Sequence, residues 1–173
     1  MTISERVQKS ASAIGDDLVA VSHRVHGFAE LAFEEFESSK FLASKSEKDF
    51  DKVDFGVAGL ETAFVAKRGS GPLHLAICAE YDALPGVGHA CGHNIIAASA
   101  LGASLLLAPF VDELGITLSL MGTPAEEAGG GKIIMMDAGL FEDEDLAMMI
   151  HPAPLEGDRM PCAAASHIEV NYQ

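Results

Sequence analysis

The chain has 173 residues, which is enough for one domain with its own hydrophobic core. Apolar residues make up 49% of it and the mean hydropathy is +0.22, which excludes a globally disordered chain. The net charge of −15 would repel nucleic-acid phosphates, so nucleic-acid binding is not expected and a cation is the more natural partner.

Cysteine usage and the N-terminus bear on the compartment. The chain has three cysteines, an odd number, and they are widely spaced, which does not fit a disulfide framework: Cys78, Cys91 and Cys162. Residues 1–13 are polar and lack the apolar segment of a secretory signal. No window approaches the ~18 apolar residues of a transmembrane helix. We therefore expect a cytoplasmic protein with no membrane partner.

Two helices are predicted first. Apolar residues from Ile3 to Val25 recur at spacings of three and four, which predicts a helix of about six turns that Gly27 ends. A second helix is predicted over residues 33–45, with Phe33, Phe36, Lys40 and Phe41 on one side. Its acidic start, Glu34, Glu35 and Glu37, is interpreted as a solvated first turn.

Strands and helices then alternate. The predicted strands are residues 60–67, 73–79, 116–121, 146–150 and a weak last one at 163–172. The first two could form a hairpin through the turn at residues 69–72. Further helices are predicted from residue 93 or 94 to about 108, and over residues 132–138 before Gly139. This order predicts an α/β fold, a mixed sheet with flanking helices.

Polar side chains follow three of these strands directly. They are Asp82, Glu126, Glu127 and His151. In open α/β sheets, ligand sites lie beyond the carboxyl ends of the strands, so these side chains are expected to meet there. Imidazoles and carboxylates are suitable ligands for a divalent metal such as zinc.

Cys91 and His93 are candidate metal ligands in the loop before the small-residue helix. Gly92 between them lets the backbone turn tightly, so that both side chains could reach one centre. A metal-bound thiol would be deprotonated and could bridge two ions. The ordinary alternatives are a small buried cysteine and a hydrogen-bonded histidine. His89 competes as a ligand, but we interpret it as a loop residue.

The adjacent Glu126 and Glu127 point in different directions, so one could bind metal while the other handles a proton. The alternative is a solvated acidic turn.

Asp82 is a candidate to orient a metal-ligating imidazole, or else a turn residue. We interpret four further polar residues as exposed groups near the end of the first helix: His23, His26, Glu30 and Glu34. Neither a phosphate-binding loop nor a serine-hydrolase nucleophile motif is present.

The segment AEYDALPGVGHACGHN, residues 79–94, resembles the metallo-amidohydrolases related to aminoacylase, indole-acetyl-amino-acid hydrolase and carboxypeptidase G. It is most similar to the branch with aminobenzoyl-glutamate hydrolase and β-alanyl-lysine-type dipeptidases. GTPAEE at 122–127 and MMIHP at 148–152 match the next two blocks in order. HGFAEL at 26–31 resembles a further box, with Ala29 in place of its usual proline.

The resemblance implies a zinc-aminopeptidase-like fold and a set of site roles. Cys91 would bridge two metal ions, His93 and His151 would complete the first site, and Glu127 would bind the second ion. Glu126 would be the general acid/base. The ions would be zinc or manganese, with nickel possible, and the substrate a small N-acyl amino acid, aminobenzoyl-glutamate or a dipeptide.

Members of this family are longer than 173 residues. The resemblance therefore implies that residues 1–173 are the N-terminal portion of a catalytic domain, without the lid or dimerisation domain and the C-terminal catalytic portion. The full-length parent would be a homodimer, and the fragment alone would be inactive or nearly so. Two alternatives remain open: a catalytically silent metal-binding or interaction module, and redox or thiol chemistry at Cys91.

Overall fold

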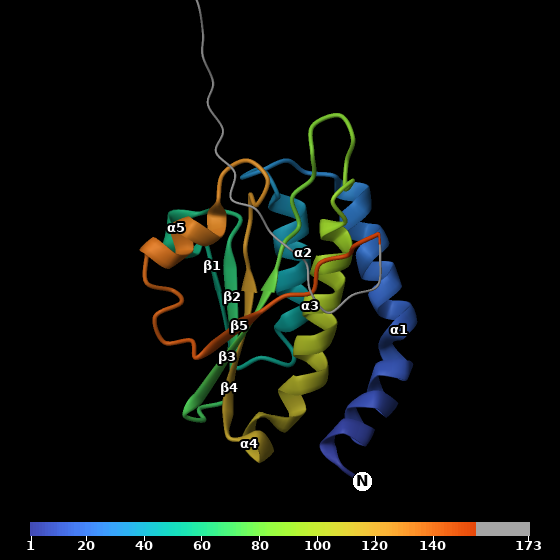
Figure 1. Cartoon of the computed structure of the whole chain (residues 1–173), viewed down its shortest axis with the longest axis vertical. Helices are drawn as coiled ribbons and strands as arrows, with labels where there is room; N and C mark the ends of the chain where they lie inside the picture. The colour runs from blue at the N-terminus through green and yellow to red at the C-terminus, as the bar shows by residue number, and fades with distance from the viewer. Residues whose placement is uncertain (155–173) are drawn as a thin grey trace, which may run out of the picture.

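The computed structural model describes residues 1–154, which form one mixed sheet with helices on both faces (Figure 1). The predicted last strand at 163–172 and Cys162 lie outside the described residues. The helices are α1 (Ile3–Phe28), α2 (Phe36–Ser46), α3 (His93–Leu107), α4 (Val111–Leu114) and α5 (Gly131–Asp137), with short 3-10 turns at Val57–Gly59 and Ala108–Phe110. The strands are β1 (Lys52–Phe55), β2 (Phe64–Arg68), β3 (Leu73–Ala79), β4 (Ile116–Gly122) and β5 (Leu146–Met148).

The five strands lie in the order β1-β2-β4-β3-β5. β3 is parallel to both β4 and β5, whereas β2 is antiparallel to β1 and β4. The predicted hairpin of β2 and β3 is therefore wrong, because β4 lies between them. The turn that joins them packs on the α4–β4 connection, where a Cβ on Gly71 would lie 2.1 Å from the carbonyl carbon of Gly115.

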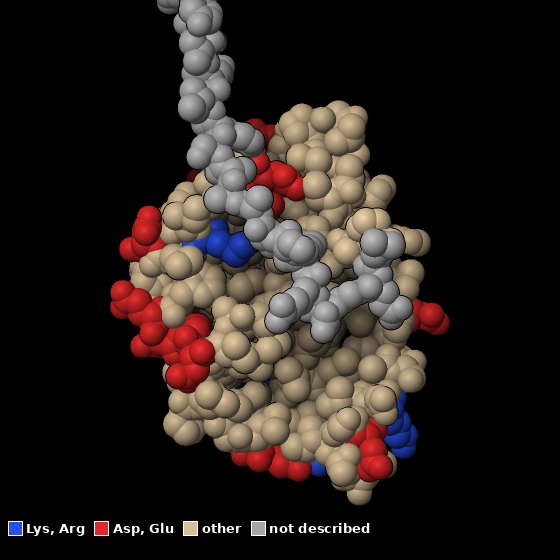
Figure 2. Space-filling view, viewed as in Figure 1, with Lys and Arg blue, Asp and Glu red and all other residues tan. Residues whose placement is uncertain are grey.

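Two hydrophobic clusters cover the two faces of the sheet. One joins α1, α2 and α3 to the sheet through residues such as Val25, Leu42 and Leu101. The other packs Met135 of α5 against Val65 and other sheet residues. The α/β fold with a mixed sheet is thus confirmed. Acidic side chains outnumber basic ones on the face shown in Figure 2, in line with the net charge of −15.

The first two helices differ from prediction in detail. α1 continues through Gly27 and ends at Phe28, after which Ala29 takes a left-handed cap conformation with φ of 47°. α2 begins at Phe36, three residues later than predicted, and it turns its small residues and Leu42 inward while Phe36 is exposed. Small side chains let α2 approach the sheet closely, which aromatic rings would prevent.

The expectation that no segment is apolar enough to span a membrane was also wrong. The helical run His93–Leu114 meets that criterion by length and composition, with a mean hydropathy of 1.8. Within this run, 61% of the 18-residue window that meets the criterion is buried inside the protein. Its apolar character is therefore accounted for by packing between α1 and the sheet, as in the core helix of a globular domain.

Candidate metal centre

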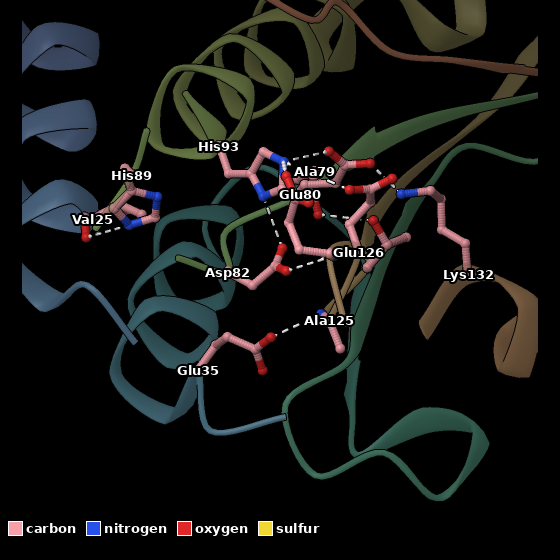
Figure 3. Close-up of polar contacts among 12 residues, drawn as sticks. Val25, Glu35, Ala79, Glu80, Asp82, His89, His93, Ala125, Glu126 and Lys132 are labelled. Carbon is pink, nitrogen blue, oxygen red and sulfur yellow. Dashed lines mark hydrogen bonds and ion pairs between the residues drawn. The ribbon is translucent and has the colours of Figure 1, made fainter. Parts of the chain in front are cut away.

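The candidate site lies at the carboxyl ends of the three parallel strands, where the sequence predicts it. Asp82 follows β3, Glu126 and Glu127 follow β4, and His151 follows β5. His93 is the first residue of α3, and Gly92 before it has a φ of 80° that glycine adopts without strain. Figure 3 shows His93 between Asp82 and the carboxylates Glu80 and Glu126.

The imidazole of His93 is held by Asp82. Nδ1 of His93 lies 2.8 Å from Oδ1 of Asp82, and the backbone N–H of Glu127 donates to Oδ2 of Asp82 over 3.0 Å. Burial raises the pKa of Asp82, but the bonds from His93 and Glu127 outweigh it, so the net shift is downward. Burial lowers the pKa of His93, yet its bond to Asp82 makes the net shift upward. This contact directs Nε2 of His93 away from Asp82.

Three carboxylates surround that nitrogen. Nε2 of His93 lies 3.4 Å from Glu80 Oε2, 3.7 Å from Glu127 Oε1 and 3.9 Å from Glu126 Oε2. Within the described residues, Nε2 is buried and has no hydrogen-bond partner. A buried imidazole nitrogen, fixed by a carboxylate on its other side and facing further carboxylates, is an arrangement suited to a divalent metal ion.

Two overlapping groups of side chains in residues 1–154 could hold a cation. Glu80, His93 and His151 form one, and His93, Glu126 and Glu127 the other; within each group the ligand atoms lie within 4.8 Å of one another. The rings of His93 and His151 have centroids 6.0 Å apart. The structure thus brings Asp82, His93, Glu126, Glu127 and His151 together.

Cys91 lies at the edge of the site and belongs to neither group. The side chain is half-buried, and its interaction with Glu127, together with burial, raises the pKa of Cys91 to about 11. The thiol is therefore protonated at neutral pH, and it becomes a ligand only where a cation displaces its proton. This opposes the alternative of thiol chemistry at Cys91, which needs a thiolate.

Glu126 has the environment of a proton-handling group. Its side chain is 42% exposed, so it can reach solvent, while partial burial and then the charge of Glu80 raise its pKa. A carboxyl with a raised pKa accepts and returns a proton more readily near neutral pH. The geometry is compatible with the predicted role of general acid/base.

A buried carboxylate fixes the loop that carries Glu126. Glu35 is fully buried; it accepts hydrogen bonds from the N–H of Ala125 and the hydroxyl of Thr62, both over 2.8 Å. Ala125 has a φ of 56°, so this contact holds a strained residue in place. The interpretation of Glu35 as part of a solvated turn was wrong, because partners distant in sequence bury it.

Other polar residues near α1 lie outside the group. Nε2 of His89 is 3.2 Å from the carbonyl oxygen of Val25. His23 and His26 are exposed, as expected, but Glu30 accepts the N–H groups of Glu37 and Ser38 and so caps α2.

Sequence reasoning missed Glu80 and Lys132. Glu80 is 1% exposed, and its Oε1 pairs with Nζ of Lys132 from α5. The two-residue periodicity of extended chain could have found Glu80, because it places Glu80 on the same side as Asp82. Nothing local in the sequence signals that Lys132 is its partner.

The chain is similar to named peptidases and hydrolases over most of its length. It is 37% identical to the Xaa-Arg dipeptidase of Mus musculus, covering 98% of this chain and 42% of the relative. It is 32% identical to one subunit of the p-aminobenzoyl-glutamate hydrolase of Escherichia coli, covering 79% of this chain and 32% of that protein. The chain thus spans less than half the length of these relatives. No protein-family profile matches it.

A solved structure supports the same relationship. A dinuclear metal-binding peptidase of the M20 family from Bacillus subtilis matches with a TM-score of 0.75 and 27% identity, over 83% of this chain and 44% of that one. An aminobenzoyl-glutamate utilization protein from Klebsiella pneumoniae, at 20% identity and a TM-score of 0.69, shares the fold.

Proposed function

We propose that this chain, a homologue of the M20 metallopeptidases and related amidohydrolases, is part of an enzyme that hydrolyses the amide bond of a small N-acyl amino acid, aminobenzoyl-glutamate or a dipeptide. The observation that carries the proposal is His93, whose Nδ1 is held by Asp82 while Nε2 faces three carboxylates without a hydrogen-bond partner in residues 1–154.

The donor set fits zinc or manganese, with nickel also possible. His93, His151, Glu127 and Cys91 would hold the metal, with a second ion in the full-length protein. Such an ion polarises the amide carbonyl and lowers the pKa of a nearby water.

The remaining steps belong to the side chains. Asp82 keeps the proton of His93 on Nδ1 and so leaves Nε2 free as a donor of electrons. Glu126 takes a proton from the attacking water and delivers it to the leaving nitrogen. A shallow pocket of about 450 Å³ beside Cys91, bounded by His26 and Pro152, gives room for part of a substrate.

The test is amide hydrolysis measured with Zn²⁺ or Mn²⁺ and with a chelator. Suitable substrates are p-aminobenzoyl-glutamate and an Xaa-Arg dipeptide, which the named relatives suggest. A full-length form is expected to be active, to lose activity with chelator and to be a homodimer. A full-length form that stays inactive with every metal would contradict the proposal.

The second candidate is a catalytically silent metal-binding module. It is favoured by the span of the chain, which is 42% of the dipeptidase relative. We expect residues 1–173 alone to bind metal but to hydrolyse amides much more slowly than the full-length form at equal added metal. Comparable rates would show that the 173 residues already form a complete catalytic site.

A further inference from the structure

We propose that Glu80 binds the divalent cation directly, as a further ligand of the ion that His93 and His151 would hold, and that Lys132 holds the Glu80 carboxylate in position. This inference rests on the metal centre of the proposed function and adds a ligand to it. The sequence motifs predict Cys91, His93, Glu127 and His151 as ligands but not Glu80.

Burial is the first argument. Glu80 is 1% exposed at the end of β3, and its Oε2 atom has no hydrogen-bond partner among residues 1–154. Nε2 of His93, which faces it, is equally buried and equally without a partner. A buried carboxylate oxygen is costly unless it is paired with a hydrogen-bond donor or a cation. A metal ion between these two atoms would satisfy both.

Distance is the second argument. Two ligand atoms on a tetrahedral zinc ion lie roughly 3.3–3.6 Å apart, given bond lengths of about 2.0–2.2 Å. Oε2 of Glu80 lies 3.4 Å from Nε2 of His93, which matches that edge. A nitrogen of His151 completes a group whose atoms lie within 4.8 Å of one another. Small side-chain adjustments would therefore bring all three onto one ion.

Lys132 explains why only one oxygen of Glu80 is free. Its Nζ, reaching from α5 on the other side of the strand ends, pairs with Oε1 of Glu80 (Figure 3). The ammonium group orients the carboxylate so that Oε2 faces His93. It offsets one of the charges of Glu80, Glu126 and Glu127, and the remaining negative charge favours a dication.

The competing explanation is that Glu80 and Lys132 form a structural ion pair that acts on the site only through charge. Replacing both by methionine separates the two. The double variant Glu80→Met, Lys132→Met removes one negative and one positive charge, so the net charge is unchanged while the ligand oxygen is lost. Apolar replacement of a buried ion pair generally preserves folding.

The experiment measures Zn²⁺ affinity of the 173-residue chain by competition with a chromophoric chelator, and the absorption spectrum of the Co²⁺-loaded protein. Variants are Glu80→Gln and the methionine double variant, each checked for folding by circular dichroism. The matched control is Glu144→Gln. Glu144 is also a buried carboxylate near a lysine, Lys67, and within residues 1–154 one of its oxygens has no partner; the other accepts the hydroxyl of Ser119, and no described histidine pairs with it.

Glu80→Gln and the double variant should each lower Zn²⁺ affinity at least about 10-fold and alter the Co²⁺ spectrum, because ligand loss typically costs that much or more. Glu144→Gln should stay within about twofold of the wild type. Unchanged Zn²⁺ affinity in the double variant, or an unchanged Co²⁺ spectrum in both variants, would show that Glu80 is not a ligand. The metal centre of the proposed function would not be contradicted by that result. A wild-type chain that binds no Zn²⁺ would instead refute both proposals.

Discussion

Nδ1 of His93 lies 2.8 Å from Oδ1 of Asp82, and the other oxygen of Asp82 accepts the backbone N–H of Glu127. One carboxylate therefore sets both the orientation of the imidazole and the position of the loop after β4. Asp82 couples two strand ends that are distant in sequence, which makes it the organising residue of the site.

Asp82→Asn should weaken Zn²⁺ binding by about 10- to 100-fold, the range expected when the partner of a ligating histidine is altered. The new amide loses the charge that favours the tautomer, and in either orientation its NH₂ group must face an N–H donor, that of His93 or that of Glu127. Chelator competition measures the effect. The control is Asp54→Asn, which removes an exposed carboxylate paired with Lys52; equal losses in both variants would contradict the assigned role.

Glu126→Gln in an active full-length form should reduce kcat at least about 10²-fold with nearly normal metal content, because it removes the proton acceptor. Glu127→Gln should lower metal content as well, since its role is ligation. Elemental analysis combined with kinetics distinguishes them. Equal metal loss in both variants would refute the division of labour between the two carboxylates.

Gly92→Ala should displace the segment that carries His151 and so weaken metal binding. A Cβ on Gly92 would lie 2.5 Å from Cγ of Pro152, the residue after His151. Gly86→Ala is the matched control: Gly86 has a similar φ of 76°, but nothing lies within 4 Å of its Cβ. Both variants suffer backbone strain of about 1 kcal/mol or more, and only Gly92→Ala should lose Zn²⁺ affinity.

Glu35→Ala should destabilise the protein by about 2–3 kcal/mol, because it leaves the N–H of Ala125 and the hydroxyl of Thr62 buried without their acceptor. Urea unfolding measures the change. Glu35→Gln, which keeps an acceptor oxygen and the side-chain shape, should lose less. A Glu35→Ala variant as stable as the wild type would show that these contacts do not hold the loop.

The burial of Glu35 also predicts that the stability of the protein depends on pH. Burial raises the pKa of Glu35 above its ordinary value of 4.5, so the native state binds this proton more tightly than the unfolded state. The stability contributed by this group therefore decreases as pH rises from 4.5 through the raised pKa, and it is regained on acidification. The free energy of unfolding of Glu35→Gln minus that of the wild type should increase over the same window and then level off.

Periodicity was enough to locate most elements and the edge of the sheet that carries the site. The strands that end at Ala79 and Gly122 are largely apolar, which predicts buried parallel strands whose carboxyl ends meet. β1 was missed because Lys52–Phe55 is short and half polar. The false hairpin arose because nothing local in β2 and β3 reveals that β4, some 40 residues on, separates them.

The site residues that stand in recognisable short motifs could be predicted from the sequence. Those whose role depends on burial in the folded chain could not. The spacing of Cys91 and His93 and the pair Glu126–Glu127 are visible in the sequence. Glu35 and Glu80 look like ordinary acidic residues until Thr62, Ala125 and Lys132 fold around them. Their importance depends on desolvation, which is a property of the whole fold.

The outermost strand gives the site a mechanical property. β5 has three residues, all exposed, and among the described strands it bonds only to β3. His151 stands just beyond this weakly anchored edge, whereas His93 belongs to the buried α3. A cation bound by both histidines would cross-link β5, at the edge of the sheet, to the helix α3. Part of the binding free energy of the cation would then stabilise the local folding of this edge. Amide hydrogens of residues 146–151 should then exchange with solvent faster than those of β4, and slow markedly when Zn²⁺ is added.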